Sequence, residues 1–229
     1  MTLLIGHRGA AALAPENSLE AIEAAAAAGA DGVELDVLRA PDGSLVLAHG
    51  PAIPPGAPPL AAGLARARDL GLLVQLDVKL GGAEAEIAAA LESAGLRGRS
   101  FVSSFSLPTL VDFAAAAPWL PRSFTYPDDR FGVAQRPSFR PFVGPGRAVV
   151  QRLLPRRLPA RLAAAQAAAA TLHWAVVTPA VVAACRAHGA EVYVWTVNDP
   201  ALARTLVEMG ADAIITDDPR HVPGGIAEP

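Results

Sequence analysis

The sequence predicts an α/β fold, a (β/α)8 TIM barrel. Short apolar runs alternate with longer segments rich in alanine and leucine, the pattern of parallel strands joined by helical crossovers. Residues able to do chemistry recur at the carboxyl ends of the apolar runs, and in this barrel those ends form the active-site face. A length of 229 residues is usual for one such barrel, so we expect a single domain over residues 1–229.

The first half of the chain has clear element boundaries. Asn17, with Glu20 three residues later, fits a helix N-cap and its acidic partner, and Gly29 fits the left-handed stop of that helix. The tripeptide Pro41-Asp42-Gly43 is a turn between two strands. In this half we predict strands at 3–7, 32–38, a short run ending at 49, 72–79, 100–105 and 122–126, and helices near 17–29, 60–70, 83–94 and 107–117.

The second half is regular only after a break. Residues 127–161 hold eight arginines and several prolines, and predict a long loop that leads to a helix near 157–169. The later strands are expected at 171–174, 191–197 and 213–216, and the later helices at 179–188 and 201–209. Alanine runs at 24–28 and 167–170 are too short to cross a bilayer, which takes about 20 apolar residues, and are interpreted as helix formers.

Composition narrows the expected partners and compartment. A net charge of −3 lacks the basic excess usual for nucleic-acid-binding proteins. Cys185 is the only cysteine, so no disulfide can form within the chain. The N-terminus enters the first predicted strand without the features of a signal peptide, and no integral membrane segment is predicted, so a cytoplasmic location is expected.

Two histidines, an arginine and a pair of carboxylates lie close together near the N-terminus. Glu34 and Asp36 alternate with apolar residues in one predicted strand, so their side chains point to the same face. His7 and Arg8 follow the first strand, and His49 follows the third. Carboxylates suit a hard divalent cation, and the pKa of histidine lies nearest neutrality. This set favours metal-assisted chemistry on an anionic oxygen substrate.

Lys79 is the only lysine in the chain. Since arginine is used at every other basic position, Lys79 is predicted to do work that needs a compact ammonium group. It follows Asp77 by two residues and so shares a strand face with it. The alternative is that Lys79 is simply a buried ion partner of Asp77.

These motifs, in this order, resemble the glycerophosphodiester phosphodiesterase family. The similarity spans nearly the whole chain and is weakest between about 118 and 170. The matching motifs are His7-Arg8-Gly9, Pro15-Glu16-Asn17, Glu34-Leu35-Asp36, Pro41-Asp42-Gly43 before His49, Asp77-Val78-Lys79, Ser103-Ser104-Phe105, Trp195-Thr196-Val197-Asn198 and the run from Gly210 to Pro219. The resemblance implies metal-dependent hydrolysis of glycerophosphodiesters, the deacylated phospholipids, to sn-glycerol 3-phosphate and an alcohol.

The resemblance also implies a role for individual residues. The metal ligands would be Glu34, Asp36 and Asp77, holding one divalent cation, Mg or Ca, with Mn also possible. General base and general acid would be His7 and His49, in an order that stays open. Substrate would be bound or oriented by Arg8, Lys79, Glu16, Asn17 and Trp195.

Three of these residues have simpler alternatives. Arg8 would also serve as an ion partner of Glu34 or Asp36. Asn17 would serve as a helix cap alone. Trp195 would either face the glycerol moiety or fill the barrel, as aromatic residues in apolar strands commonly do.

The chain also departs from the family. The family normally has glutamate in place of Asp77 and aspartate in place of Gly50. Only 27 residues separate His49 from Asp77, so the subdomain usually inserted there is nearly deleted.

Two other hypotheses remain beside glycerophosphodiester hydrolysis. One is a phospholipase D-like or lyase relative that acts on intact or lyso phospholipids, since the arginine-rich segment 130–161 would make weak contact with an anionic lipid surface. The other is a noncatalytic phosphoester-binding barrel. Head-group preference, attack by water or through a cyclic phosphate, oligomeric state and the role of residues 127–161 are left open.

Overall fold

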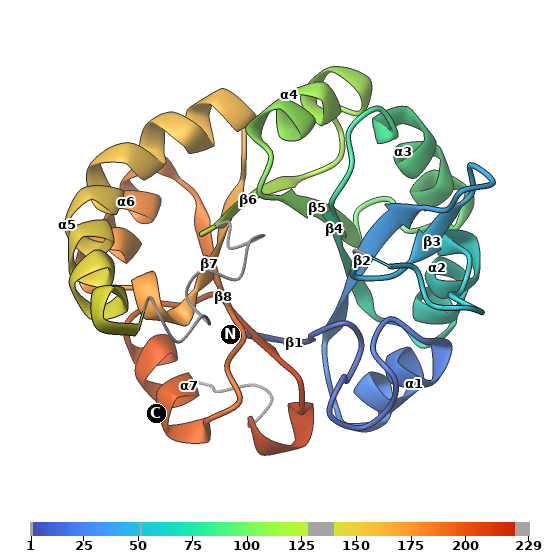
Figure 1. The fold of residues 1–229 in the computed structure, drawn as a ribbon, viewed down its shortest axis with the longest axis horizontal. Helices are drawn as coiled ribbons and strands as arrows, with labels where there is room; N and C mark the ends of the chain where they lie inside the picture. Colours follow the sequence, from blue (N-terminus) through green and yellow to red (C-terminus); the bar gives the residue numbers. More distant parts are fainter. Residues whose placement is uncertain (1, 51, 128–139, 223–229) are drawn as a thin grey trace.

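The computed structural model describes residues 2–50, 52–127 and 140–222, with the backbone alone for 140–145. In this part of the chain, eight parallel strands close into a barrel that helices surround (Figure 1). The predicted (β/α)8 barrel is therefore confirmed.

The elements follow in chain order. The strands are β1 (Leu3–Gly6), β2 (Gly32–Arg39), β3 (Leu45–Leu47), β4 (Leu73–Val78), β5 (Ser100–Ser104), β6 (Arg122–Tyr126), β7 (Ala169–His173), β8 (Glu191–Trp195) and β9 (Ala213–Thr216). The helices are α1 (Leu19–Ala27), α2 (Leu60–Asp69), α3 (Glu84–Ser93), α4 (Leu107–Ala116), α5 (Arg140–Ala165), α6 (Pro179–His188) and α7 (Pro200–Glu208), with short 3-10 turns η3 (Trp174–Val176) and η4 (Pro219–His221).

Closure of the barrel brings the two ends of the chain together. β1 pairs in parallel with β2 on one side and with β9 on the other. The antiparallel β3 pairs with the carboxyl-terminal part of β2 and stands outside the ring. Residues that follow β1 and β9 therefore lie side by side at one end of the barrel although about 210 positions separate them.

Apolar layers hold the barrel in shape. Two large clusters fill the space between the strands and the helices, one over each half of the ring. A third cluster fills the barrel interior with Ile5, Phe101, Tyr193 and Ile215 among its members. Two positions after each of these four residues stands a polar or aromatic residue at the carboxyl end of the same strand: His7, Ser103, Trp195 and Asp217. Side chains two apart share a strand face, so this layer forms a floor beneath the polar residues of that end.

Three sequence predictions about local structure are wrong. The cap of α1 is Ser18, whose hydroxyl accepts from the backbone N–H of Ala21, so Asn17 is not the cap. Ala169 and Ala170 begin strand β7 rather than ending a helix, because neighbouring strands supply ladder partners that outweigh the helix propensity of alanine.

The third correction concerns helix α5, which already begins at residue 140 rather than near 157. Its internal prolines argued for a loop. However, Leu154, Leu158 and Leu162 recur every four residues and are fully or nearly buried, so packing of this stripe outweighs the local preference of proline. Within the arginine-rich segment, residues 128–139 lie outside the described residues. No helix in the described part of the chain is both long and apolar enough to cross a membrane.

Candidate active site

Three carboxylates converge at the carboxyl end of β2 and β4. Glu34 and Asp36 point into the barrel from β2, and Asp36 is the direct register partner of Asp77 on β4. All three are buried, and one oxygen from each lies within 4.8 Å of the others. The expectation that these residues gather in one place is confirmed. Three buried oxygen ligands form a donor set that suits a hard divalent cation.

Neighbouring polar groups hold two of the carboxylates in place. Asn17 donates to the Asp36 carboxylate at 3.0 Å and accepts from the Asp36 backbone N–H at 2.9 Å. On the other side, Ser103 donates to Asp77 Oδ1 at 2.8 Å, and Gln75 donates to Ser103 at 2.9 Å. Such outer contacts orient metal-binding carboxylates. Asn17 therefore orients Asp36, a contact that the sequence did not predict.

Lys79 lies between two of the acids. Its Nζ is 2.9 Å from Asp36 Oδ1 and 2.6 Å from Asp77 Oδ2. The ion pair with Asp77, which was the alternative interpretation of Lys79, is present, and Lys79 also pairs with Asp36. Burial opposes the charge, but Asp77 and Asp36 raise the pKa of Lys79 above its usual value, so the ammonium stays charged.

Glu34 has the least compensated charge of the three acids. Its Oε2 accepts from the backbone N–H of Arg8 at 2.9 Å and lies 3.9 Å from His7 Nε2. Burial first, and then the charge of Asp36, raise the pKa of Glu34 to about 7. In contrast, Lys79 and Arg8 lower the pKa of Asp36 although burial opposes this. A divalent cation at the three acids would supply the positive charge that Glu34 lacks.

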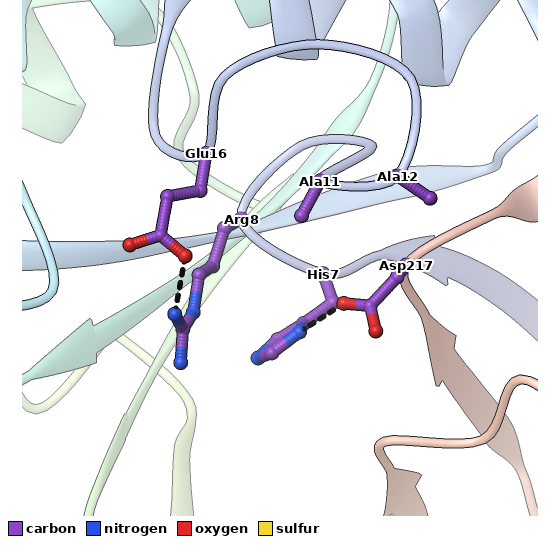
Figure 2. A pocket seen from close by; sticks show the side chains of 6 residues that line it. All are labelled: His7, Arg8, Ala11, Ala12, Glu16 and Asp217. Carbon is purple, nitrogen blue, oxygen red and sulfur yellow. Dashed lines mark hydrogen bonds and ion pairs between the residues drawn. The ribbon is translucent and has the colours of Figure 1, made fainter.

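His7 is held by a carboxylate that our sequence predictions did not include among the site residues. Its Nδ1 lies 2.6 Å from Asp217 Oδ1 (Figure 2). Burial lowers the pKa of His7, but the hydrogen bond with Asp217 and the charge of Glu34 outweigh it, so the net shift is upward. Because Nδ1 faces Asp217, the other ring nitrogen, Nε2, faces Glu34 and the barrel mouth.

Asp217 is itself fixed by Asn198. The Asn198 amide donates to Asp217 Oδ2 at 2.6 Å, and its carbonyl oxygen accepts from the Asp217 backbone N–H at 2.9 Å and from the Thr216 hydroxyl at 3.0 Å. The signal that could have found Asp217 is closure of the predicted barrel rather than a local pattern: Asp217 directly follows the last strand, and β9 pairs with β1, which His7 directly follows.

The turn after β1 places His7 and Arg8 at the mouth. Arg8 has φ of 52° and Gly9 has φ of 87°, so the chain turns through the left-handed region at these two residues. A Cβ on Gly6 would lie 2.0 Å from the carbonyl oxygen of Gly9, so the turn closes only with glycine there. The two glycines thus let two reactive side chains leave one strand end together.

Arg8 points toward Glu16 across the rim. Its Nη1 lies 2.5 Å from Glu16 Oε2 (Figure 2). Its Nε lies 3.3 Å from Asp36 Oδ2 without making a hydrogen bond. The alternative interpretation as an ion partner of Asp36 therefore agrees with the geometry. A cavity of about 340 Å³ opens here, lined by His7, Arg8, Ala11, Ala12, Glu16 and Asp217.

His49 lies at the outer side of the same mouth. It is exposed and follows β3 by two residues. Desolvation lowers the pKa of His49, and the charges of Asp36, Arg8, Lys79 and Glu16 all act on it, which shows its nearness to the acidic cluster.

Trp195 stands at the end of β8 and partly fills the mouth. Its ring contacts Phe105 and His173, with centroids 6.0 and 5.3 Å apart, and its Nε1–H donates to the carbonyl of Thr171 at 3.3 Å. The Phe105 ring in turn lies 5.3 Å from Lys79 Nζ. An aromatic wall therefore faces the acidic cluster.

Comparison with known proteins identifies the family and a shared fold. The model of the glycerophosphoryl diester phosphodiesterase family matches residues 7–55 and 70–221. A glycerophosphodiester phosphodiesterase of Caldanaerobacter subterraneus is 25% identical over 95% of this chain and 95% of its own length. Among solved structures, a phosphodiesterase of Oleispira antarctica in complex with the product sn-glycerol-3-phosphate has a TM-score of 0.74 at 23% identity, covering 97% of this chain and 95% of its own. A glycerophosphoryl diester phosphodiesterase homologue from Silicibacter pomeroyi has a TM-score of 0.75 at 23% identity, and the match covers 96% of this chain and 91% of that chain.

Proposed function

The chain belongs to the glycerophosphoryl diester phosphodiesterase family, and we propose that it hydrolyses glycerophosphodiesters to sn-glycerol 3-phosphate and a free alcohol. One observation carries the proposal: His7 lies 3.9 Å from Glu34 in a cluster of three buried carboxylates, and the charges of Arg8, Lys79 and His49 all act on Asp36 in that cluster. Proton-transfer groups, a cation site and fixed positive charges are the parts that cleavage of an anionic diester needs.

One divalent cation, Mg or Ca with Mn also possible, would be held by Glu34, Asp36 and Asp77. The geometry of the three oxygens and the raised pKa of Glu34 support this. When bound, such a cation neutralises phosphate charge and acts as a Lewis acid. Arg8 has a guanidinium at the cavity rim and would grip a nonbridging phosphate oxygen through its planar donors. Lys79 would keep the acids charged and in place.

His7 is the general base in this proposal and His49 is the general acid. The Asp217 carboxylate accepts the Nδ1 proton of His7, so neutral His7 presents a free electron pair at Nε2, and the imidazolium that forms is stabilised by the same carboxylate. His7 takes the proton from the attacking oxygen, either water or the glycerol 2-hydroxyl. His49, on the exposed side of the mouth, gives a proton to the departing alcohol oxygen.

The substrate is expected to lie across the mouth between two unlike surfaces. The cavity beside His7 is polar, with Glu16 and Arg8 at its rim. Another part of the rim, at the ends of β5 and β8, carries the Phe105 and Trp195 rings. The phosphate would lie between them, and one substituent would contact each side.

The test is release of glycerol 3-phosphate from glycerophosphocholine and glycerophosphoethanolamine, with EDTA, Mg, Ca or Mn. We expect metal-dependent release that His7→Ala abolishes. A cyclic glycerophosphate among the products would indicate attack by the glycerol hydroxyl. Folded protein that binds Mg or Ca but releases no product from any glycerophosphodiester would refute the proposal and favour the noncatalytic alternative.

A further inference from the structure

Positive charge is concentrated on helix α5. Its 26 residues include six arginines and no acidic residue. Since the whole chain has a net charge of −3, the remainder of the chain carries −9. A basic segment in an otherwise acidic chain indicates a surface that binds a polyanion.

In the part of α5 whose side chains are described, the apolar residues face the barrel and all five arginines are exposed: Arg147, Arg152, Arg156, Arg157 and Arg161. Leu154, Leu158 and Leu162 are buried against the strands. Arg152 and Arg156, four positions apart and so on one side of the helix, are both exposed. Figure 1 shows α5 curving around the outside of the barrel beside α6. The helix therefore presents a basic outer surface.

This surface adjoins the active-site end of the barrel. The Gln151 side chain donates to the carbonyl of Ala175 in η3 at 2.9 Å, and η3 directly follows the carboxyl end of β7. The middle of α5 is thus tied to the same rim that carries the candidate active site.

Apolar side chains are exposed at this junction. Among the described residues, three large hydrophobic side chains are exposed: Val149 on α5 (57%), Trp174 on η3 (37%) and Val111 on α4 (43%). Val149 lies two residues before Gln151 on α5, and Trp174 directly precedes Ala175, the residue that Gln151 contacts. A groove of about 180 Å³ lies between α5 and the end of β6, where it is lined by Tyr126, Val149, Val150, Leu153, Leu154, Arg157 and Arg161.

We propose that α5 and η3 dock this protein on an anionic phospholipid surface, with the barrel mouth beside the membrane. The arginines would meet lipid phosphates, while Val149 and Trp174 would enter the boundary between head groups and acyl chains, where tryptophan is favoured. A duplex nucleic acid offers the same phosphates but no apolar layer for the two side chains, so the lipid surface fits better. The proposal does not depend on the reaction proposed above, because a surface site and a catalytic site are separate parts of the chain.

The experiment is cosedimentation of the full chain with phosphatidylcholine vesicles, with and without phosphatidylglycerol. We expect binding only to the anionic vesicles, and weaker binding as salt screens the charges. Each arginine near such a surface contributes roughly a fivefold gain in partitioning, so Arg152→Gln with Arg156→Gln should lower the partition coefficient roughly 30-fold. Val149→Ser should lower it as well, by roughly fivefold.

A matched control removes the same charge elsewhere. Arg97→Gln with Arg204→Gln changes two exposed arginines outside α5 and should lower partitioning less than about threefold. Hydrolysis of soluble glycerophosphocholine should be the same in all variants, which reports on folding and on the reaction independently of docking. Three results would each overturn the proposal. The first is absence of wild-type binding to anionic vesicles at low salt, and the second is an equal loss of binding in the control variant. The third is binding that Val149→Ser does not change, together with binding of the protein to duplex DNA.

Discussion

Replacing Asp217 by asparagine tests whether this carboxylate sets up His7 as the base. Asparagine has nearly the same size, so the change removes the charge and one acceptor with little effect on packing. The Asn198 amide is fixed by its bonds to Thr216 and to the backbone at 217, and it donates toward residue 217. The new carboxamide is therefore expected to turn its oxygen to Asn198 and its NH2 group to His7, which forces the His7 proton onto Nε2.

The expected loss of kcat in Asp217→Asn has two causes. Two unit charges about 4 Å apart interact by roughly 1 kcal/mol in water and about 4 kcal/mol at an effective dielectric constant near 20. The Asp217 side chain is 30% exposed, so we take about 2 kcal/mol, or roughly 30-fold, for the lost stabilisation of imidazolium. Loss of the right tautomer adds to this, within the roughly 10²–10⁴-fold that general base catalysis provides. We expect kcat to fall roughly 10²–10³-fold with little change in KM.

The assay is steady-state release of glycerol 3-phosphate as a function of pH. Because Asp217 is one of the groups that raise the pKa of His7, the acid limb of the kcat/KM profile should move to lower pH in the variant. Adding Asn198→Asp gives the new asparagine an acceptor for its NH2 group, turns its oxygen back to His7 and should recover at least about tenfold in kcat. A decrease in kcat below about tenfold, or no recovery in the double variant, would refute the assignment of Asp217 as a positioning residue.

Three further predictions concern the acidic cluster and the turn below it. Ser103→Ala removes the donor to Asp77 and should weaken divalent-cation affinity roughly 10- to 100-fold by calorimetry; unchanged affinity would contradict a positioning role. Glu34 has a folded-state pKa of about 7 against an ordinary 4.5, so without metal its charge lowers stability as pH rises through that interval. Glu34→Gln should therefore raise the metal-free unfolding free energy at pH 8 by roughly 1–3 kcal/mol while abolishing hydrolysis, and a lower Tm would count against this reasoning. In Gly9→Ala, the new Cβ would meet the α1 backbone at 2.6 Å, whereas in Gly29→Ala φ is similar but nothing lies within 4 Å of the new Cβ. We therefore expect Gly9→Ala to lower the free energy of unfolding, measured with urea, by at least about twice as much as Gly29→Ala does.

Local sequence rules predicted much of this site because most of its pairs are close in sequence or adjacent in the sheet. Glu34 and Asp36 share a face through the two-residue period of a strand, and Asp77 joins them through one register pairing. The His7–Asp217 pair depends on closure of the ring, which no local pattern encodes. The position of Asn17 could not be predicted, because asparagine suits both a helix N-cap and a left-handed turn. Its φ of 58° shows that it lies in a left-handed turn.

Helix α5 is a segment whose structure local sequence rules did not predict. Its prolines at 155 and 159 disfavour a helix when the segment is considered in isolation. The buried leucine stripe fixes the helix only when the barrel is present to receive it, so tertiary packing decides the structure of this segment. The same segment carries the arginines on which the docking proposal rests.

The two departures from the family have local physical causes. The shorter Asp77 side chain is met by Ser103 and Lys79, so its oxygen stays within 4.8 Å of the other ligands and the cluster is not opened. After His49, the chain turns through Gly50 with φ of 83° and returns beside β3, where Pro59 forms a bridge with Val46. A short return of this kind favours glycine over the aspartate usual in the family, because the turn needs a left-handed residue.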